Sequence, residues 1–173
     1  MIIKSKGFIL RHFRMSDAKG FFDCQQDRLS RLGFMTIPKN LADAKKEIRK
    51  KIAEYKKRKP HSESFVIDVK GDFAGFIEIH DLNEKFFEHR AKISYGIHPG
   101  FRNKGLATKA VKVITPYAFK KYKLKRVWAW CRSYNKASAR VLEKAGYKLE
   151  GILRKNKFKD GKYLDDMVWA VVR

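Results

Sequence analysis

The segment Arg102-Asn103-Lys104-Gly105-Leu106-Ala107 has the residue types of a phosphate-binding loop. Glycine lets the main chain approach a ligand closely, and the first N–H groups of a helix have no partner within that helix. If a helix begins at Leu106, those amides and the helix dipole suit a pyrophosphate, with Arg102 and Lys104 adding positive charge. A glycine before a helix also marks an ordinary turn, so this pattern alone leaves both meanings open.

The flanking residues predict that the loop joins the end of a strand to the start of a helix. Residues 91–98 are an apolar run that Pro99-Gly100 breaks, which indicates a strand. From Leu106 to Tyr117 apolar residues recur at three- and four-residue steps, which indicates a helix. Pro116 lies inside this pattern. Because proline removes a backbone donor and clashes with the preceding turn, we expect it to bend the helix or end it early.

Strand patterns occur along the whole chain, with no internal repeat and no long linker between them. They cover residues 7–14, 64–70, 73–80, 91–98, 127–131, 148–153 and 163–172. Helix patterns alternate with these strands. The sequence therefore predicts one α/β domain over residues 1–173, a sandwich of helices around a single mixed sheet.

Three further helices are indicated by their caps. Ser16-Asp17 is a candidate N-cap for a first helix whose apolar face reaches Leu29. Asn40 is the candidate cap of an amphipathic helix that ends before Pro60. The third runs from about residue 136 to residue 145, and Gly146 suits the position after its end, where a positive φ is needed.

The charge is strongly positive, with 41 lysine and arginine residues against 18 acidic residues and a formal net charge of +23. Such a field attracts polyanions, so a nucleic acid, a phosphate-rich cofactor or a merely solvated surface all fit. Cys24 and Cys131 lack metal-type spacing, which argues against a metal site and favours a reducing, cytoplasmic compartment. No stretch reaches the length of a membrane span or resembles a signal peptide, so we expect no membrane contact.

The pattern Arg102-x-x-Gly105-x-Ala107 after a strand resembles the acetyl-CoA loop of the GNAT superfamily of N-acetyltransferases. The likeness extends over nearly the whole chain to a branch that acetylates the N-terminal amines of ribosomal proteins. Other matching segments are Leu10-Arg11-His12-Phe13-Arg14-x-Ser16-Asp17-Ala18, Asn135-Lys136-Ala137-Ser138, Glu143-Lys144-Ala145-Gly146-Tyr147, Glu150-Gly151-x-x-Arg154 and Asp160-Gly161-Lys162-Tyr163-x-Asp165. The resemblance implies the acyl-CoA N-acyltransferase fold. This is a mixed sheet of six to seven strands flanked by helices, whose central parallel strands splay apart near His98 and Arg132.

The resemblance also implies how acetyl-CoA, the co-substrate, would bind. The backbone near Ile97 and His98 would pair with its pantetheine arm, as an added strand would. Amides from Arg102 to Ala107 would hold the diphosphate. Asn135 would hydrogen-bond the pantetheine. An asparagine at this place is also a helix N-cap, and the two roles are compatible.

For the chemical step, the resemblance implies direct attack of an amine on the thioester. Ser138 occupies the position where the branch has the serine that protonates the departing thiolate, so Ser138 is the candidate acid. A serine in a first helical turn can equally serve only to satisfy backbone groups. Other branches have a tyrosine one turn later, where this chain has Leu142.

The general base is less clear because Lys92 and Lys157 occupy the positions where relatives carry a glutamate. Glu78, His80 and His98 are possible substitutes, and each also fits an ordinary strand or surface position. A third possibility is that no dedicated base exists. An α-amine with a pKa of about 8 has a neutral fraction near pH 7, whereas a lysine amine at about 10.4 needs far more help.

We therefore expect acetyl transfer to a primary amine, in particular the N-terminal α-amine of a ribosomal-protein-like substrate, by a monomer or homodimer. Alternatives are a small amine (polyamine, amino acid or antibiotic), a catalytically silent coenzyme A sensor, and a protein that docks on ribosomal or other RNA through its basic runs at residues 56–59 and 120–126. Cys131 and the tryptophans Trp128, Trp130 and Trp169 lie in apolar strand patterns, so we expect them in the core.

Overall fold

The computed structural model describes residues 2–173. The helices and strands are β1 (Ile2–Ser5), β2 (Phe8–His12), the 3-10 helix η1 (Met15–Asp17), α1 (Ala18–Asp23), α2 (Arg28–Gly33), α3 (Leu41–Tyr55), β3 (Glu63–Val69), β4 (Asp72–His80), β5 (Arg90–Ile97), the 3-10 helix η2 (Pro99–Phe101), α4 (Leu106–Tyr122), β6 (Arg126–Arg132), α5 (Lys136–Lys144), β7 (Lys148–Lys159) and β8 (Lys162–Val172). Eight strands form one sheet in the order β1-β2-β3-β4-β5-β6-β8-β7. The predicted mixed sheet with flanking helices is confirmed.

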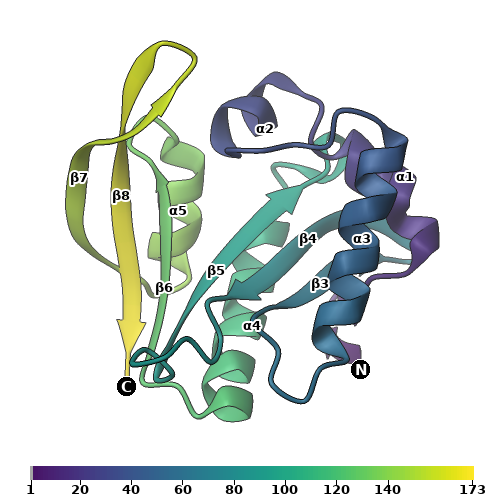
Figure 1. The fold of residues 1–173 in the computed structure, drawn as a ribbon, viewed down its shortest axis with the longest axis horizontal. Helices are drawn as coiled ribbons and strands as arrows, with labels where there is room; N and C mark the ends of the chain where they lie inside the picture. Colours follow the sequence, from purple (N-terminus) through teal and green to yellow (C-terminus); the bar gives the residue numbers. More distant parts are fainter. Residues whose placement is uncertain (1) are drawn as a thin grey trace.

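Helices cover both faces of the sheet (Figure 1). One apolar cluster joins the sheet to α4 and α5, and it contains Ile77 of β4 and Ile93 of β5. A second cluster joins the sheet to α1 and α3, and it contains Phe76. Because side chains alternate along a strand, every second residue of β4 and β5 lies on the sheet face that α1 and α3 cover, while the others lie on the face that α4 covers.

The two central parallel strands separate as predicted. β5 and β6 pair only over a short stretch, from Arg90 opposite Arg126 to Lys92 opposite Trp128. Beyond Lys92 they diverge (Figure 1), because β5 keeps its pairing with β4 and β6 keeps its pairing with β8. This divergence leaves the inner backbone edges of both strands without a strand partner, and it opens the space that becomes the functional cleft.

The sheet has eight strands instead of the expected six to seven, because β1 was not predicted. Only Ile2 and Ile3 supply an apolar signal there, and the strand depends on pairing with β2 across a turn at Gly7, where φ is +89°. The last hairpin is also longer than expected. β7 continues to Lys159 and contains two register irregularities, so its side-chain pattern does not alternate regularly.

The first predicted helix is two short helices, α1 and α2. The Asp17 side chain makes no capping bond to α1, because its carboxylate accepts hydrogen bonds from Arg11 at 2.8 and 2.9 Å. Leu29 lies on α2 and is 65% exposed, so the prediction that it extends the apolar face was wrong. The cap at Asn40 is confirmed, since its Oδ1 accepts from the Asp43 amide at 2.8 Å.

Pro116 does not end α4, which continues to Tyr122. The proline is exposed, so water can reach the carbonyl that loses its helical donor. Buried residues on both sides of it, Thr115 and Ala118, hold the helix on the sheet. Packing therefore outweighs the local cost of the proline in this helix.

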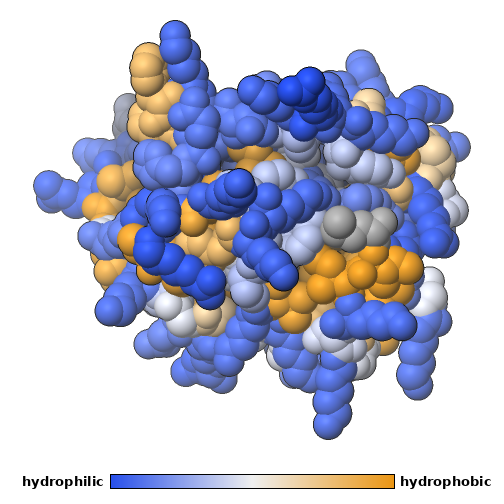
Figure 2. All heavy atoms as spheres, turned by 90° about the horizontal axis from the view of Figure 1, so that it is seen from below, coloured by the Kyte–Doolittle hydropathy of each residue, from blue (hydrophilic) through white to orange (hydrophobic). Residues whose placement is uncertain are grey.

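The surface carries most of the positive charge. Figure 2 shows hydrophilic side chains over most of the face seen from below, with apolar patches between them. Residues 56–59 and the lysines at 120, 121, 123 and 125 are exposed. None of the helices formed by residues 2–173 is long and apolar enough to cross a membrane.

Candidate active site

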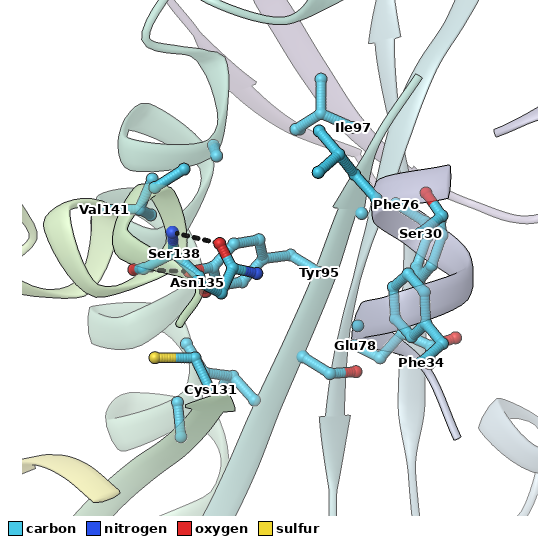
Figure 3. A pocket seen from close by; sticks show the side chains of 18 of the residues that line it. Ser30, Phe34, Phe76, Glu78, Tyr95, Ile97, Cys131, Asn135, Ser138 and Val141 are labelled. Carbon is cyan, nitrogen blue, oxygen red and sulfur yellow. Dashed lines mark hydrogen bonds between the residues drawn. The ribbon is translucent and has the colours of Figure 1, made fainter. Parts of the chain in front are cut away.

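A cleft of about 1240 Å³ lies where β5 and β6 separate. The start of α4 and the start of α5 line one part of it. Residues of α1, α2 and α3, together with β4, line the other part. Figure 3 shows Ser138 and Asn135 on one side of this cleft and Phe34, Phe76 and Glu78 on the opposite side. Two reactants can therefore approach each other from the two faces of the sheet.

The N-terminus of α4 presents unpaired backbone donors to the cleft. Gly105 is its N-cap in the left-handed conformation, with φ at +69°, and no side chain caps the helix. The first amide with a backbone acceptor is that of Lys109, which donates to the Gly105 carbonyl at 3.1 Å. Within residues 2–173, the amides of Leu106, Ala107 and Thr108 have no acceptor, and all three residues line the cleft. These donors fit a diphosphate.

Arg102, which was predicted to add positive charge at this place, lines the cleft, and its guanidinium is paired with a carboxylate. Its guanidinium donates to both carboxylate oxygens of Asp27 at 2.8 Å, and its Nε donates to the Ile97 carbonyl at 3.0 Å. Its backbone amide donates to Pro99 at 3.4 Å. The free backbone donors therefore begin after Arg102, at Asn103, and continue into α4.

Two other predicted contacts lie beside the cleft rather than in its lining. The His98 amide donates to Ala74 at 2.9 Å, and its ring accepts from the Gly100 amide at 3.3 Å. The Lys104 ammonium donates to the Gly100 carbonyl at 3.3 Å. Ile97, Asn103, Gly105, Leu106, Ala107, Asn135 and Ser138 do line the cleft.

The Arg102–Asp27 pair ties the loop before α4 to α2. Asp27 caps that helix by accepting from the Leu29 amide at 3.1 Å. Hydrogen bonds from Arg102 outweigh burial and hold the pKa of Asp27 well below its usual range. A carboxyl group whose pKa is lower in the folded protein than in the unfolded chain stabilises the fold at pH values above its unfolded-state pKa of about 3.9. This stabilisation is lost as the pH falls toward the folded-state pKa. The pair is therefore complete at neutral pH.

We predict that Asp27→Ala loosens α2 while leaving the sheet intact, because it removes both the cap and the partner of Arg102. At pH 7, hydrogen–deuterium exchange should rise by about 10-fold at residues 28–34, equivalent to the loss of about 1.4 kcal/mol of local stability. Exchange in β3 and β4 should not change. The matched control is Asp72→Asn, an exposed residue at the start of β4. Unchanged exchange in α2 of the Asp27 variant would contradict this coupling.

Ser138 and Asn135 meet at the start of α5. Asn135 accepts from the Ser138 amide at 3.1 Å, which confirms its N-cap role. Its Nδ2 has no partner within the described chain and is on the cleft side in Figure 3, so contact with a ligand stays compatible with capping. The Ser138 hydroxyl lies 2.8 Å from the Tyr95 hydroxyl. This serine is therefore part of a hydroxyl pair at the wall of the cleft.

Tyr95 is a site residue that was not predicted. It comes from β5, and 43 positions separate it from Ser138, so periodicity gives no sign that they meet. Burial raises the pKa of Tyr95, and the hydrogen bond to Ser138 only partly opposes this. The phenol stays protonated at neutral pH and can donate to the serine. The alternation of β5, which turns Tyr95 toward α4 and α5, was the one available signal.

Cys131 lies in the core cluster near Ser138 and is 4% exposed, so its predicted packing role is confirmed. Burial raises the pKa of its thiol, which keeps it protonated and a poor nucleophile. Leu142, where other branches have a tyrosine, is fully buried in the core. Of Cys131, Leu142 and Ser138, only Ser138 has a hydroxyl proton and a half-buried position on the cleft wall.

Both lysines at the usual base positions are held by carboxylates. The Lys92 ammonium is 3.2 Å from Asp81, and that of Lys157 is 3.1 Å from Asp166. Lys157 also lies 3.7 Å from the ring centre of Trp130. Trp169 is buried as predicted, whereas Trp128 and Trp130 are only half-buried, with lysine or arginine groups over their rings. The expectation that all three tryptophans are core residues was therefore wrong for two of them.

Comparison with known proteins identifies the family. A model of the family described as "Acetyltransferase (GNAT) domain" matches residues 8–148 of the 173. The chain belongs to the GNAT acetyltransferase family. It is an N-acetyltransferase that uses acetyl-CoA, and the amides at the start of α4 are the donors in this structure that suit the coenzyme's diphosphate.

Relatives within the GNAT family differ in their acceptors. The probable N-acetyltransferase YjcK of Bacillus subtilis (strain 168) is 34% identical over 128 residues, covering 72% of this chain and 70% of that protein. Spermidine N(1)-acetyltransferase of Escherichia coli (strain K12) is 30% identical over 99 residues, which is 57% of this chain and 52% of the relative. RimL, a ribosomal L7/L12 alpha-N-protein acetyltransferase solved with coenzyme A, shares the fold with a TM-score of 0.85 at 18% identity, over 99% and 98% of the chains.

Proposed function

We propose that this GNAT enzyme acetylates the α-amine of a peptide or protein N-terminus. The observation that carries this choice is the charge of the cleft lining. It has two carboxylates, Glu47 and Glu78, against seven basic side chains, which are Lys51, Lys92, Arg102, Arg132, Lys136, Arg140 and Lys144. The first four of these basic groups are ion-paired with carboxylates, and Lys136, Arg140 and Lys144 have no carboxylate partner within residues 2–173, so the lining keeps a net positive charge. Glu78 is already paired with Lys51 and His80. Such a lining repels a polycation such as spermidine, while it accepts a chain with a single amine.

The acceptors named for relatives agree with this choice in part. RimL acts on the α-amine of a ribosomal protein, and its fold covers 99% of this chain. The spermidine enzyme matches only about half of either chain. An α-amine also needs less assistance than a lysine side chain, since its pKa of about 8 is lower than the value of about 10.4 for lysine. These points support a protein N-terminus as the acceptor.

In the proposed reaction, bound acetyl-CoA supplies the thioester carbonyl that the amine attacks. The amides of Leu106, Ala107 and Thr108 hold the diphosphate, and the Nδ2 of Asn135 donates to the pantetheine. The Tyr95 hydroxyl donates a hydrogen bond to Ser138 Oγ. This orients the Ser138 hydroxyl proton toward the departing sulfur, where it neutralises the thiolate. Each role uses a contact that the folded chain already makes or a donor that it leaves free.

The test compares four acceptors at pH 7 with the same acetyl-CoA concentration. They are a peptide with a free N-terminus and no lysine, an N-blocked peptide with one lysine, spermidine, and an aminoglycoside. We predict kcat/KM at least about 100-fold higher for the free N-terminus than for the lysine peptide, following the difference in amine pKa. Preference for the lysine peptide, spermidine or the aminoglycoside would overturn the proposed acceptor, although acetyl transfer itself would stand.

A further inference from the structure

The acceptor face of the cleft contains a histidine whose ring is held from two sides. His80 ends β4, and its Nε2 lies 2.7 Å from the Ser94 hydroxyl and 3.3 Å from the Glu78 carboxylate. Glu78 and Ser94 are opposite each other across β4 and β5. All three residues line the cleft. We propose that His80 accepts the proton of the attacking amine, with Glu78 and Ser94 as the residues that position its ring.

The position of the group follows from the strand register. Lys92 is the last residue of β5 that pairs with β6, and Ser94 lies two residues further, where the strands have separated. Alternation places Ser94 on the face opposite Tyr95. Tyr95 contacts Ser138, on the side of α5 and the cofactor loop. His80 therefore faces the gap between the strands from the acceptor side.

The hydrogen bonds also select the ring nitrogen. A carboxylate only accepts, so we assign the ring proton to Nε2, where the single N–H is shared between the Glu78 carboxylate and the Ser94 hydroxyl. In a neutral ring the lone pair is then on Nδ1, for which residues 2–173 provide no partner. The side chain is 28% exposed, so an amine in the cleft can reach it. An imidazole with one hydrogen-bonded nitrogen and one free nitrogen is suited to accept a proton from an amine.

Glu78 itself is a poor proton acceptor. Burial opposes its charged form, but the charge of Lys51 and the hydrogen bond to His80 outweigh burial and hold the pKa of Glu78 well below its usual range. Its carboxylate therefore stays charged and ion-paired. Its role is to orient His80 and to stabilise the imidazolium that forms. The other charged groups around this pair are Glu47 on α3, Lys92 across the strands and Asp81 beside Lys92.

This inference rests on the proposed transfer to an amine, and its steps balance. The amine nitrogen forms a bond to the acetyl carbon, and the carbon–sulfur bond breaks. His80 Nδ1 takes the proton from the nitrogen and later releases it to water. Ser138 gives its proton to the sulfur and regains one from water. The products are the N-acetylated amine and free coenzyme A.

The test compares His80→Gln with wild type over pH 5.5 to 9, using the free N-terminal peptide. We expect kcat to fall about 100-fold, with coenzyme A affinity unchanged, and the acid limb of the pH–rate profile to move up to the pKa of the peptide's own α-amine, about 8. Glu78→Gln should instead keep the acid limb and move it to lower pH, because a neighbouring carboxylate favours the charged ring. His89→Gln, an exposed residue outside the cleft, is the control and should behave as wild type.

An active His80→Gln variant with the wild-type acid limb would overturn the role of His80 while leaving acetyl transfer intact. Wild type that acetylates no amine would instead refute the proposed function. If His80→Gln does not bind coenzyme A, turnover is measured instead with the His80→Ala variant, with and without added imidazole. Partial recovery of turnover by imidazole supports the inference, and failure of imidazole to raise turnover in a variant that binds coenzyme A counts against it.

Discussion

Placing a glutamate at residue 107 should nearly abolish coenzyme A binding. Ala107 lines the cleft in the first turn of α4, and its amide is one of the free donors. A carboxylate about 4 Å from a diphosphate costs about 4 kcal/mol at an effective dielectric of 20, which corresponds to about a 1000-fold loss of affinity. Isothermal titration calorimetry with coenzyme A measures this directly.

The fold should tolerate Ala107→Glu, because acidic residues in a first helical turn interact favourably with the helix dipole. The matched control is Lys109→Glu, on the next part of the same helix, where the residue is exposed and outside the cleft. It changes the net charge by more, yet we expect it to keep most of the affinity. If both variants lost the same affinity for coenzyme A, the loss would come from the net charge of the protein. It would then give no support to a diphosphate bound at the start of α4.

The second large effect should come from Ser138→Ala. Loss of the hydroxyl that protonates the leaving sulfur should lower kcat by about 100-fold while the affinity for acetyl-CoA changes little, because general acid catalysis acts in the transition state. Single-turnover kinetics with the N-terminal peptide separate the two quantities. Ser133→Ala is the control, because Ser133 is close to Ser138 in sequence but does not line the cleft. Turnover equal to wild type in Ser138→Ala would remove this serine from the mechanism.

The features of the site that depend on local sequence could be predicted. The glycine before α4, the cap at Asn135 and the separation of β5 from β6 follow from residue types within one segment or from the family resemblance. The placement of Ser138 at the cleft follows for the same reason. Backbone preference and capping act over a few residues, so a single sequence contains the information needed.

Contacts between distant segments could not be predicted in this way. Arg102 is 75 residues from Asp27, and Lys51 is 27 residues from Glu78. Each pair depends on how α2 or α3 rests on the sheet, which periodicity does not determine. The prediction for Arg102 therefore did not include its ion pair with Asp27 at the start of α2. The same reason explains why Tyr95 was missed and why β1, whose stability depends on its partner strand, was not recognised.

The central claim is that free amides at the start of α4 bind the diphosphate of coenzyme A. Titration of the ¹⁵N-labelled protein with coenzyme A, followed by two-dimensional NMR, tests it residue by residue. We expect the amide signals of residues 103–108 to shift most and to saturate together, while those of α3 move little. Unchanged signals from residues 103–108 at millimolar coenzyme A, or saturation at another segment alone, would contradict the claim.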